Sequence, residues 1–223
     1  MNRWLVVWAL IVLIIIVLLG SPAAFWARWV DWPDDWQPQS ISGTLWNGQT
    51  QQIGPLGPVS WQLKLAGPGA DVQVGALQRH WLVALRGWPW KWQASLQDGG
   101  STATPEQPVR LEGQWEGRID ISGRGQACES SVGSLVAPQL DLLSPWAMPL
   151  GHGEISLDCA ESPRLHARLE QPGQHRFDLR ADLTARTTEL SGTAAKASEL
   201  GGLLRQFGLL GQGQESFQTR FVW

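Results

Sequence analysis

Few residues of this 223-residue sequence are arranged in a way that could do chemistry. The histidines form no HExxH motif and no close pair with metal-ligand spacing, although His166 and His175 could meet across an expected hairpin. The sequence also holds no GxxxxGKS/T or GxGxxG phosphate-binding loop and no GxSxG nucleophile motif. We therefore predict no metal, no cofactor and no enzymatic activity.

The acidic residues nearest to a catalytic arrangement share one face of an expected strand. Glu112, Glu116 and Asp120 could mimic the carboxylate pair of a glycosidase. Arg110 and Arg118 alternate with them, however, and alternating opposite charges are typical of a solvated ion-pair face. We interpret this face as structural.

Tryptophan is over-represented, since the chain has 15 Trp and no Tyr. The segment WPWKW, residues 88–92, could stack on a sugar or a lipid, and in extended backbone its three Trp would share one face. The alternative is aromatic packing on a curved sheet or contact with a membrane surface. The candidate groove or contact aromatics are Trp61, Trp90, Trp92 and Trp115.

Cys128 and Cys159 are the only two cysteines. An even pair in an exported domain usually forms a disulfide, and there is no CxxC motif that would indicate redox catalysis. We predict a Cys128–Cys159 disulfide, with two separate buried thiols as the alternative.

The elements that must carry these residues begin with a long apolar segment. No charged residue occurs from Trp4 to Ala27, a length of about 36 Å as a helix, which is enough to span a bilayer. Aromatic residues lie near both ends, as at membrane interfaces. We predict an N-terminal transmembrane anchor over residues 1–28, with Arg3 on the cytoplasmic side. The alternative is a cleaved signal peptide, with Ser21-Pro22-Ala23 as the cleavage site. Either way, the chain beyond about residue 30 is exported.

The rest of the chain favours strands. Residues 29–40, with Pro33 and Pro38, are interpreted as a juxtamembrane linker. From residue 41 to 223 we expect one β-rich periplasmic domain, a strongly curved antiparallel sheet with at least seven strands, because apolar residues recur with a period of two. The segments with this period are 59–65, 109–122, 153–159, 164–170, 176–186 and 216–223.

Other local signals refine this picture. Gly113 and Gly117 indicate a bend, a bulge or a close approach of another backbone. Residues 171–174, Gln-Pro-Gly-Gln, are expected to connect a hairpin. Residues 130–147 and 196–210 are predicted to form one or two short helices. The net charge of −3, without a basic cluster, excludes a nucleic-acid partner.

The stretch ISGTLWNGQ, residues 41–49, is the most distinctive in the chain. Gly43 and Gly48 bracket the motif, and Asn47-Gly48 predicts a tight turn because both residue types tolerate positive φ. The motif would thus be a strand running into a turn, with Trp46 as a packing anchor. Its residues are Gly43, Thr44, Leu45, Trp46, Asn47 and Gly48.

A short N-terminal span, a Trp- and Pro-containing linker, this motif and the following Trp61-Gln62-Leu63 strand resemble the type II secretion system protein N family, often called GspN. The resemblance implies an accessory structural component in the cell inner membrane, single-pass, with its C-terminal domain in the periplasm. Its partners would be the secretin and the inner-membrane platform proteins, and its role the export of folded proteins from the periplasm. The family supplies no catalytic residues.

Similar strand turns occur in large lipid-transport proteins that resemble AsmA. The alternative function is therefore a periplasmic protein that binds a lipid or another hydrophobic ligand in a β-groove.

Overall fold

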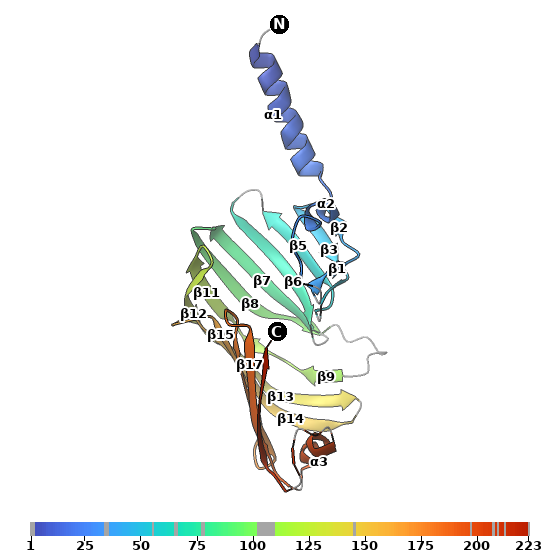
Figure 1. Ribbon diagram of the computed structural model, residues 1–223, viewed down its shortest axis with the longest axis vertical. Coiled ribbons are helices and arrows are strands. Elements are labelled where there is room, and N and C mark those ends of the chain that lie inside the picture. Colours follow the sequence, from blue (N-terminus) through green and yellow to red (C-terminus); the bar gives the residue numbers. More distant parts are fainter. Residues whose placement is uncertain are drawn as a thin grey trace.

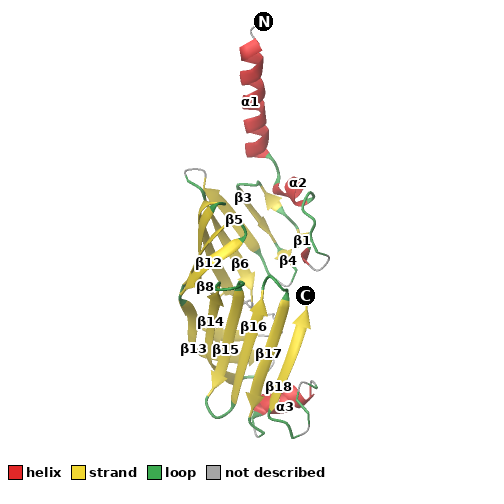
Figure 2. Ribbon diagram, turned by 60° about the vertical axis from the view of Figure 1, so that its left-hand side comes forward, coloured by secondary structure: helices red, strands yellow, loops and turns green. Residues whose placement is uncertain are grey.

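The computed structural model describes residues 3–33, 36–54, 56–64, 67–76, 79–101, 110–144, 146–196, 198–206, 208, 210–211 and 213–222. Three helices occur within these ranges: α1 (Arg3–Gly20), α2 (Ala23–Ala27) and α3 (Glu199–Gln206). None of the helices formed by the described residues combines the length and the apolar character needed to cross a membrane. The molecule is elongated, with α1 at one end and α3 at the other (Figures 1 and 2).

Strands make up most of the described chain, so the prediction of a mainly β fold is confirmed. They are β1 (Pro38–Gln39), β2 (Ser42–Gly43), β3 (Asn47–Thr50), β4 (Gln52–Ile53), β5 (Val59–Lys64), β6 (Gly69–Ala76), β7 (Arg79–Trp88), β8 (Lys91–Ser101), β9 (Arg110–Gly113), β10 (Glu116–Gly117), β11 (Ile119–Arg124), β12 (Ala127–Val132), β13 (Ser134–Ser144), β14 (Met148–Asp158), β15 (Arg164–Gln171), β16 (His175–Asp182), β17 (Thr187–Ala194) and β18 (Ser216–Val222).

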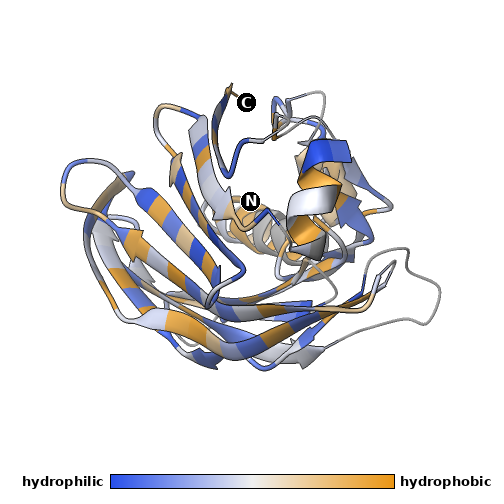
Figure 3. Cartoon of the chain, turned by 90° about the horizontal axis from the view of Figure 1, so that it is seen from below, coloured by the Kyte–Doolittle hydropathy of each residue, from blue (hydrophilic) through white to orange (hydrophobic). Residues whose placement is uncertain are grey.

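The described strands form two eight-stranded antiparallel sheets and one small two-stranded sheet. The first large sheet, here called sheet C, has the order β12-β11-β8-β7-β6-β5-β3-β2. The second, sheet D, has the order β10-β13-β14-β15-β16-β17-β18, with β9 also paired to β13. Sheet C lies nearer α1, and sheet D continues the molecule away from it (Figure 1). Viewed along the long axis, the strands follow a curved path, and apolar and polar residues alternate along them (Figure 3).

One hairpin belongs to both sheets. Its outer part pairs β11 with β12, with Asp120 opposite Val132, and its inner part pairs β10 with β13, with Gly117 opposite Leu135. The register is the same in both parts, so the hairpin is continuous but passes from sheet C into sheet D.

Two glycines allow the hairpin to change direction at this crossing. Gly117 and Gly133 have φ of +94° and +95°, in the left-handed region that favours glycine. A Cβ on Gly117 would lie 2.3 Å from the Ser134 carbonyl oxygen, and one on Gly133 would lie 2.2 Å from that of Arg118. Of the bend, bulge or close backbone approach expected at Gly117, the structure has a bend with a close backbone approach, and it marks the corner between the sheets.

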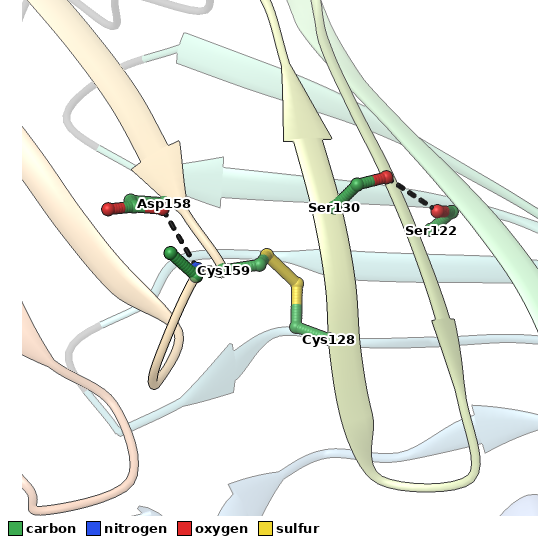
Figure 4. The surroundings of a disulfide bond; sticks show 6 residues. Ser122, Cys128, Ser130, Asp158 and Cys159 are labelled. Atoms are coloured by element: carbon green, nitrogen blue, oxygen red, sulfur yellow. Dashed lines mark hydrogen bonds between the residues drawn. A yellow bond between two sulfur atoms is a disulfide. The ribbon is translucent and has the colours of Figure 1, made fainter.

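A disulfide and a buried ion pair also join the two sheets. Cys128 of β12 is bonded to Cys159, which directly follows β14, with the Cα atoms 5.4 Å apart (Figure 4). This confirms the predicted pairing. Arg79 of β7 donates two hydrogen bonds to Asp98 of β8 and a third to the Gly113 carbonyl of β9, which belongs to sheet D.

The two helix predictions had different outcomes. The prediction over 196–210 is confirmed for α3, Glu199–Gln206, where the Ser198 hydroxyl accepts a hydrogen bond from the Gly201 N–H at the start of the helix. The prediction of a helix over 130–147 was wrong, because β12 and β13 occupy this segment. Leu135 and Ala137 lie opposite Ile155 and Gly153 of β14, so a period of two decides which residues are buried.

Candidate functional site

The GTLWNG motif forms a tight turn between β2 and β3. The Thr44 N–H donates to the Asn47 carbonyl over 2.8 Å, and the Asn47 N–H donates to the Thr44 hydroxyl over 3.2 Å. The sequence prediction placed the turn at Asn47-Gly48 with positive φ, and this was wrong. β3 already begins at Asn47, and the positive φ of the motif, +90°, is at Gly43.

Gly48 is needed in this strand for packing. It lies opposite Trp61 of β5, and a Cβ on Gly48 would lie 2.4 Å from the Trp61 ring. The Trp61 indole N–H donates to the Leu45 carbonyl over 3.0 Å, and the Leu63 N–H donates to the Trp46 carbonyl over 2.7 Å. The strand that contains Trp61-Gln62-Leu63 therefore holds the GTLWNG turn in place through these two hydrogen bonds.

The motif also holds the N-terminal helices. Pro22 forms an isolated β-bridge with Thr44, and Ala23, the first residue of α2, is buried. α2 packs against β2, so the direction in which α1 leaves sheet C is set by contacts of the motif.

Each large sheet has one apolar and one polar face. The apolar side of sheet C follows from its register and consists of Val59, Trp61, Leu63, Ala70, Val72, Val74, Trp81, Val83, Leu85, Trp92, Ala94, Leu96, Ile119 and Ile121. That of sheet D consists of Leu135, Ala137, Ile155, Leu157, Leu165, Ala167, Leu169, Phe177, Leu179, Ala181, Leu190 and Phe217. Most of these side chains are only half-buried, whereas Ile119 and Leu135 at the corner are fully buried.

Trp115 connects the two apolar faces. Its ring packs against Trp81 of sheet C, with the centroids 5.9 Å apart at 61°. A Cβ on Gly153 of sheet D would lie 3.1 Å from the same ring. Since one side chain contacts both faces, they meet on the inner side of the corner. A cavity of about 510 Å³ lies beside Trp115. Its lining is mixed: Trp115, Leu111 and Leu143 are apolar, and Arg79, Asp98, Arg110, Glu112 and Glu116 are charged.

The candidate aromatics occupy different environments. Trp61, Trp92 and Trp115 are half-buried on the apolar side, and Trp92 covers Gly123 as Trp61 covers Gly48. Trp90 is in the turn between β7 and β8, where it stacks on Trp88 with centroids 5.1 Å apart. The expected common face for the WPWKW tryptophans was wrong: Trp92 pairs with Gly87 and Trp88 with Lys91, because the chain reverses between them.

The polar faces carry ion pairs. Arg168 donates to Asp178 over 2.8 Å across β15 and β16, and Arg176 donates to the other carboxylate oxygen over 3.3 Å. The hydrogen bond from Arg168 is the main reason why the pKa of Asp178 lies below its ordinary value. For Asp98, burial raises the pKa, but the hydrogen bonds from Arg79 and from the Gly100 N–H outweigh it and lower the pKa overall.

The histidines do not form a site. His166 lies opposite Arg180 and His175 opposite Gln171, so the two do not pair across their hairpin. Across the described ranges, no three His, Cys, Asp or Glu side chains are grouped closely enough to hold a metal ion. His175 is 5% exposed, and its Nε2 lies 3.0 Å from the Leu150 carbonyl oxygen.

Sequence reasoning missed Trp81 and the buried Arg79–Asp98 pair. The signal for Trp81 was present but weak: Trp81, Val83 and Leu85 recur with a period of two in β7, although Leu82 between them is also apolar. The ion pair had no local signal, since its partners lie on two strands and its third acceptor, Gly113, lies in the other sheet.

Comparison with known proteins supplies the family. The model of the family described as type II secretion system (T2SS), protein N, matches residues 34–220, a range that takes in the GTLWNG turn and both large sheets except the last two residues of β18. No match was found among curated proteins or among solved structures. The chain therefore belongs to the type II secretion system protein N family.

Proposed function

We propose that this protein is a non-enzymatic accessory component of the type II secretion system that is anchored in the inner membrane and contacts the secretin or the inner-membrane platform proteins. The observation that carries the proposal is the family match over residues 34–220. In this proposal residues 1–28 are the anchor, residues 29–40 the linker and residues 41–223 the periplasmic domain.

The exposed side chains of α1 support the anchor. The apolar side chains from Trp4 to Leu13, together with Ile16 and Val17, are exposed, and no other described part of the chain packs against them. Water is an unfavourable environment for such a surface, whereas lipid is favourable. The disulfide between Cys128 and Cys159 is consistent with the oxidising periplasm.

Contact with partner proteins has a candidate element in β18. This strand is the last in sheet D, with β17 on one side and no paired strand on the other among the described residues. Val222 near its end is 79% exposed. Edge strands offer unpaired N–H and C=O groups to an incoming strand, so β18 is suited to β-strand addition by a partner.

The test is photocrosslinking in intact membranes. A photoreactive residue replaces Arg220 in β18 or, as a matched control, Arg168 in the middle of the polar face of sheet D. Capture of the secretin or of a platform protein from position 220, but not from 168, supports the proposal. If neither position captures a secretion protein while the apparatus is assembled, the proposed contact at β18 is wrong.

The half-buried apolar faces favour a second candidate function, binding of a lipid or another hydrophobic ligand. They meet at Trp115 and lead into the cavity at the corner. Leu85 and Arg86 are adjacent on opposite faces of sheet C, which makes them a matched pair for crosslinking. Lipid captured from position 85 and not from 86 would support this function, and no lipid from either position would argue against it.

A further inference from the structure

The turn between β7 and β8 exposes two stacked tryptophans. The Trp88 and Trp90 rings are nearly parallel, with an interplanar angle of 3°, and the residues are 53% and 66% exposed. Trp61, Trp81, Trp92 and Trp115 of the sheets are all half-buried. Such a pair in water costs free energy, so its exposure indicates a surface that is covered by another phase or molecule.

This turn lies at the end of sheet C from which α1 emerges. The ends of β7 and β8 that it joins are the ends nearer α1 (Figure 1). Hydrogen bonds connect this turn to the two turns beside it. The Gly87 N–H donates to the Pro68 carbonyl over 2.8 Å, and the Gly125 N–H donates to the Pro89 carbonyl over 2.7 Å. The GTLWNG turn, which holds α2 through Thr44, belongs to the same end.

A second exposed aromatic group lies at this end. Phe25, Trp26 and Trp29 of α2 and the residues after it contact one another, with ring centroids 5.9 and 6.3 Å from Phe25. All three are exposed. Two aromatic groups thus lie at the end of the sheet from which the apolar helix leaves.

The side chains at the turn have the chemistry of a bilayer interface. Indole rings prefer the headgroup region, where the ring is in an apolar environment and the N–H remains hydrated. Lys91, between Trp90 and Trp92, is exposed and has no carboxylate partner among the described residues, so it can approach lipid phosphate.

From these observations we propose that the Trp88–Lys91 turn rests on the surface of the phospholipid bilayer that holds α1, with the Trp88 and Trp90 rings in the headgroup region. This proposal rests on the membrane anchor in the proposed function. It gives the protein a second point of contact with the membrane, so that sheet C does not rotate freely about the linker.

The experiment uses the full chain in vesicles of phosphatidylcholine and phosphatidylglycerol that contain brominated phosphatidylcholine, a quencher of tryptophan fluorescence. In this design Trp88→Ser/Trp90→Ser should lower the amount of fluorescence that the brominated lipid quenches by about a third. Among the described residues, α1, the aromatic group at α2 and this turn together hold six exposed tryptophans, and the double variant removes two of them. The control is Trp146→Ser, since Trp146 is 48% exposed but lies between β13 and β14 in the other sheet. This control should leave the quenched fluorescence unchanged.

Flotation of the same vesicles separates the two proposals. If the chain does not float with the vesicles, both the anchor and the docked turn are wrong. If it floats but the double variant behaves like Trp146→Ser, the docked turn alone is overturned. An environment-sensitive fluorescent residue at position 90 provides a second measurement, and its emission should shift to the blue on vesicle binding, whereas the same residue at 146 should not shift.

Discussion

At the scale of single residues, aromatic rings packed on glycines are a recurring device of the sheets. Trp61 covers Gly48 and Trp92 covers Gly123, each from the opposite position of the neighbouring strand, and Phe177 covers Gly192 in sheet D. The ring lies where a side chain would otherwise project, so glycine at these positions is required by packing and not by a special backbone conformation.

Gly48→Ala should therefore destabilise the fold. The added methyl group would overlap the Trp61 ring, and overpacking of this kind costs about 1–3 kcal/mol. Urea unfolding of the full chain measures the loss. Gly67→Ala is the control, because a Cβ there meets no atom within 4 Å, and its effect should stay within about 0.5 kcal/mol. Equal effects of both variants would contradict the packing role of Gly48.

The buried His175 should make stability depend on pH. Burial lowers its pKa below the ordinary 6.5, although the hydrogen bond to the Leu150 carbonyl acts in the opposite direction. The folded state therefore binds fewer protons than the unfolded chain, and the stabilising contribution is complete above about pH 6.5 and is lost as the pH falls through the folded pKa.

Urea midpoints measured from about pH 7.5 down to pH 5 should fall, and they should fall less in His175→Gln. The lowered pKa of Asp98 affects stability only at more acidic pH, because its ordinary value is 3.8. The exposed His152 supplies the control: His152→Gln should retain the slope of the wild type. An unchanged slope in His175→Gln would show that another group titrates.

At the scale of elements, period-two patterns predicted most of the strands they indicated. The expected strand over 109–122 was wrong, because its described part is divided among β9, β10 and β11, so Glu112, Glu116 and Asp120 lie on three strands in two sheets. β5, β14, β15, β16 and β18 fall where alternation was found, and the Gln171–Gln174 connection is a turn closed by a 3.0 Å hydrogen bond. These elements were predictable because one face of each sheet is apolar and the other polar. The errors arose where strand pairing and packing between distant residues decide the structure, because a local pattern of apolar residues does not contain these contacts.

Three errors have this origin. Residues 130–147 contain apolar runs that fit a helix or a strand, and only pairing of β13 with β14 decides between them. At the GTLWNG turn, Gly48 is explained by Trp61, a residue 13 positions later. In WPWKW the chain reverses direction within the motif, so the alternation of side chains between the two faces of a strand does not continue from Trp88 to Trp92. The disulfide was predictable because the two cysteines had no other partner.

The contact between β7, β8 and β9 provides an element-scale prediction. Arg79→Met leaves the carboxylate of Asp98 buried without its cation, and breaking a buried pair in this way costs about 3–5 kcal/mol. Chemical denaturation should show this loss, and Arg79→Met/Asp98→Leu should recover much of it.

The exposed Arg118–Asp120 pair offers the comparison for this variant. Its side chains are well exposed, so Arg118→Met should cost less than about 1 kcal/mol. Should Arg79→Met be as mild as Arg118→Met, the buried pair does not hold the sheets together.

At the scale of the whole molecule, the two sheets are joined by a shared hairpin, the Arg79 contact and the Cys128–Cys159 disulfide. The disulfide connects an edge strand of sheet C to the end of β14 in sheet D. Cys128 lies opposite Gly123 of β11, and Cys159 lies beyond Ser156, the last residue of β14 that pairs with β13, so the disulfide joins the sheets beyond this pairing.

Removal of the disulfide should weaken the whole fold. For cysteines 31 residues apart, the chain-entropy relation gives about 3–4 kcal/mol. Cys128→Ser/Cys159→Ser should lose this amount in urea unfolding, and a reducing agent should produce the same loss in the wild type but none in the variant. A variant as stable as the oxidised wild type would mean that the hairpin and the Arg79 contact suffice.

The order in which the strands pair also affects how the chain folds. From β6 to β8 and from β14 to β18, each strand pairs with the one that precedes it in the sequence. A chain that folds from its N-terminus can therefore add strands one at a time to an existing edge, without waiting for distant segments. Because sheet D begins on the hairpin that completes sheet C, the growing edge passes from one sheet to the other at Gly117 and Gly133, and assembly can proceed in one direction along the molecule.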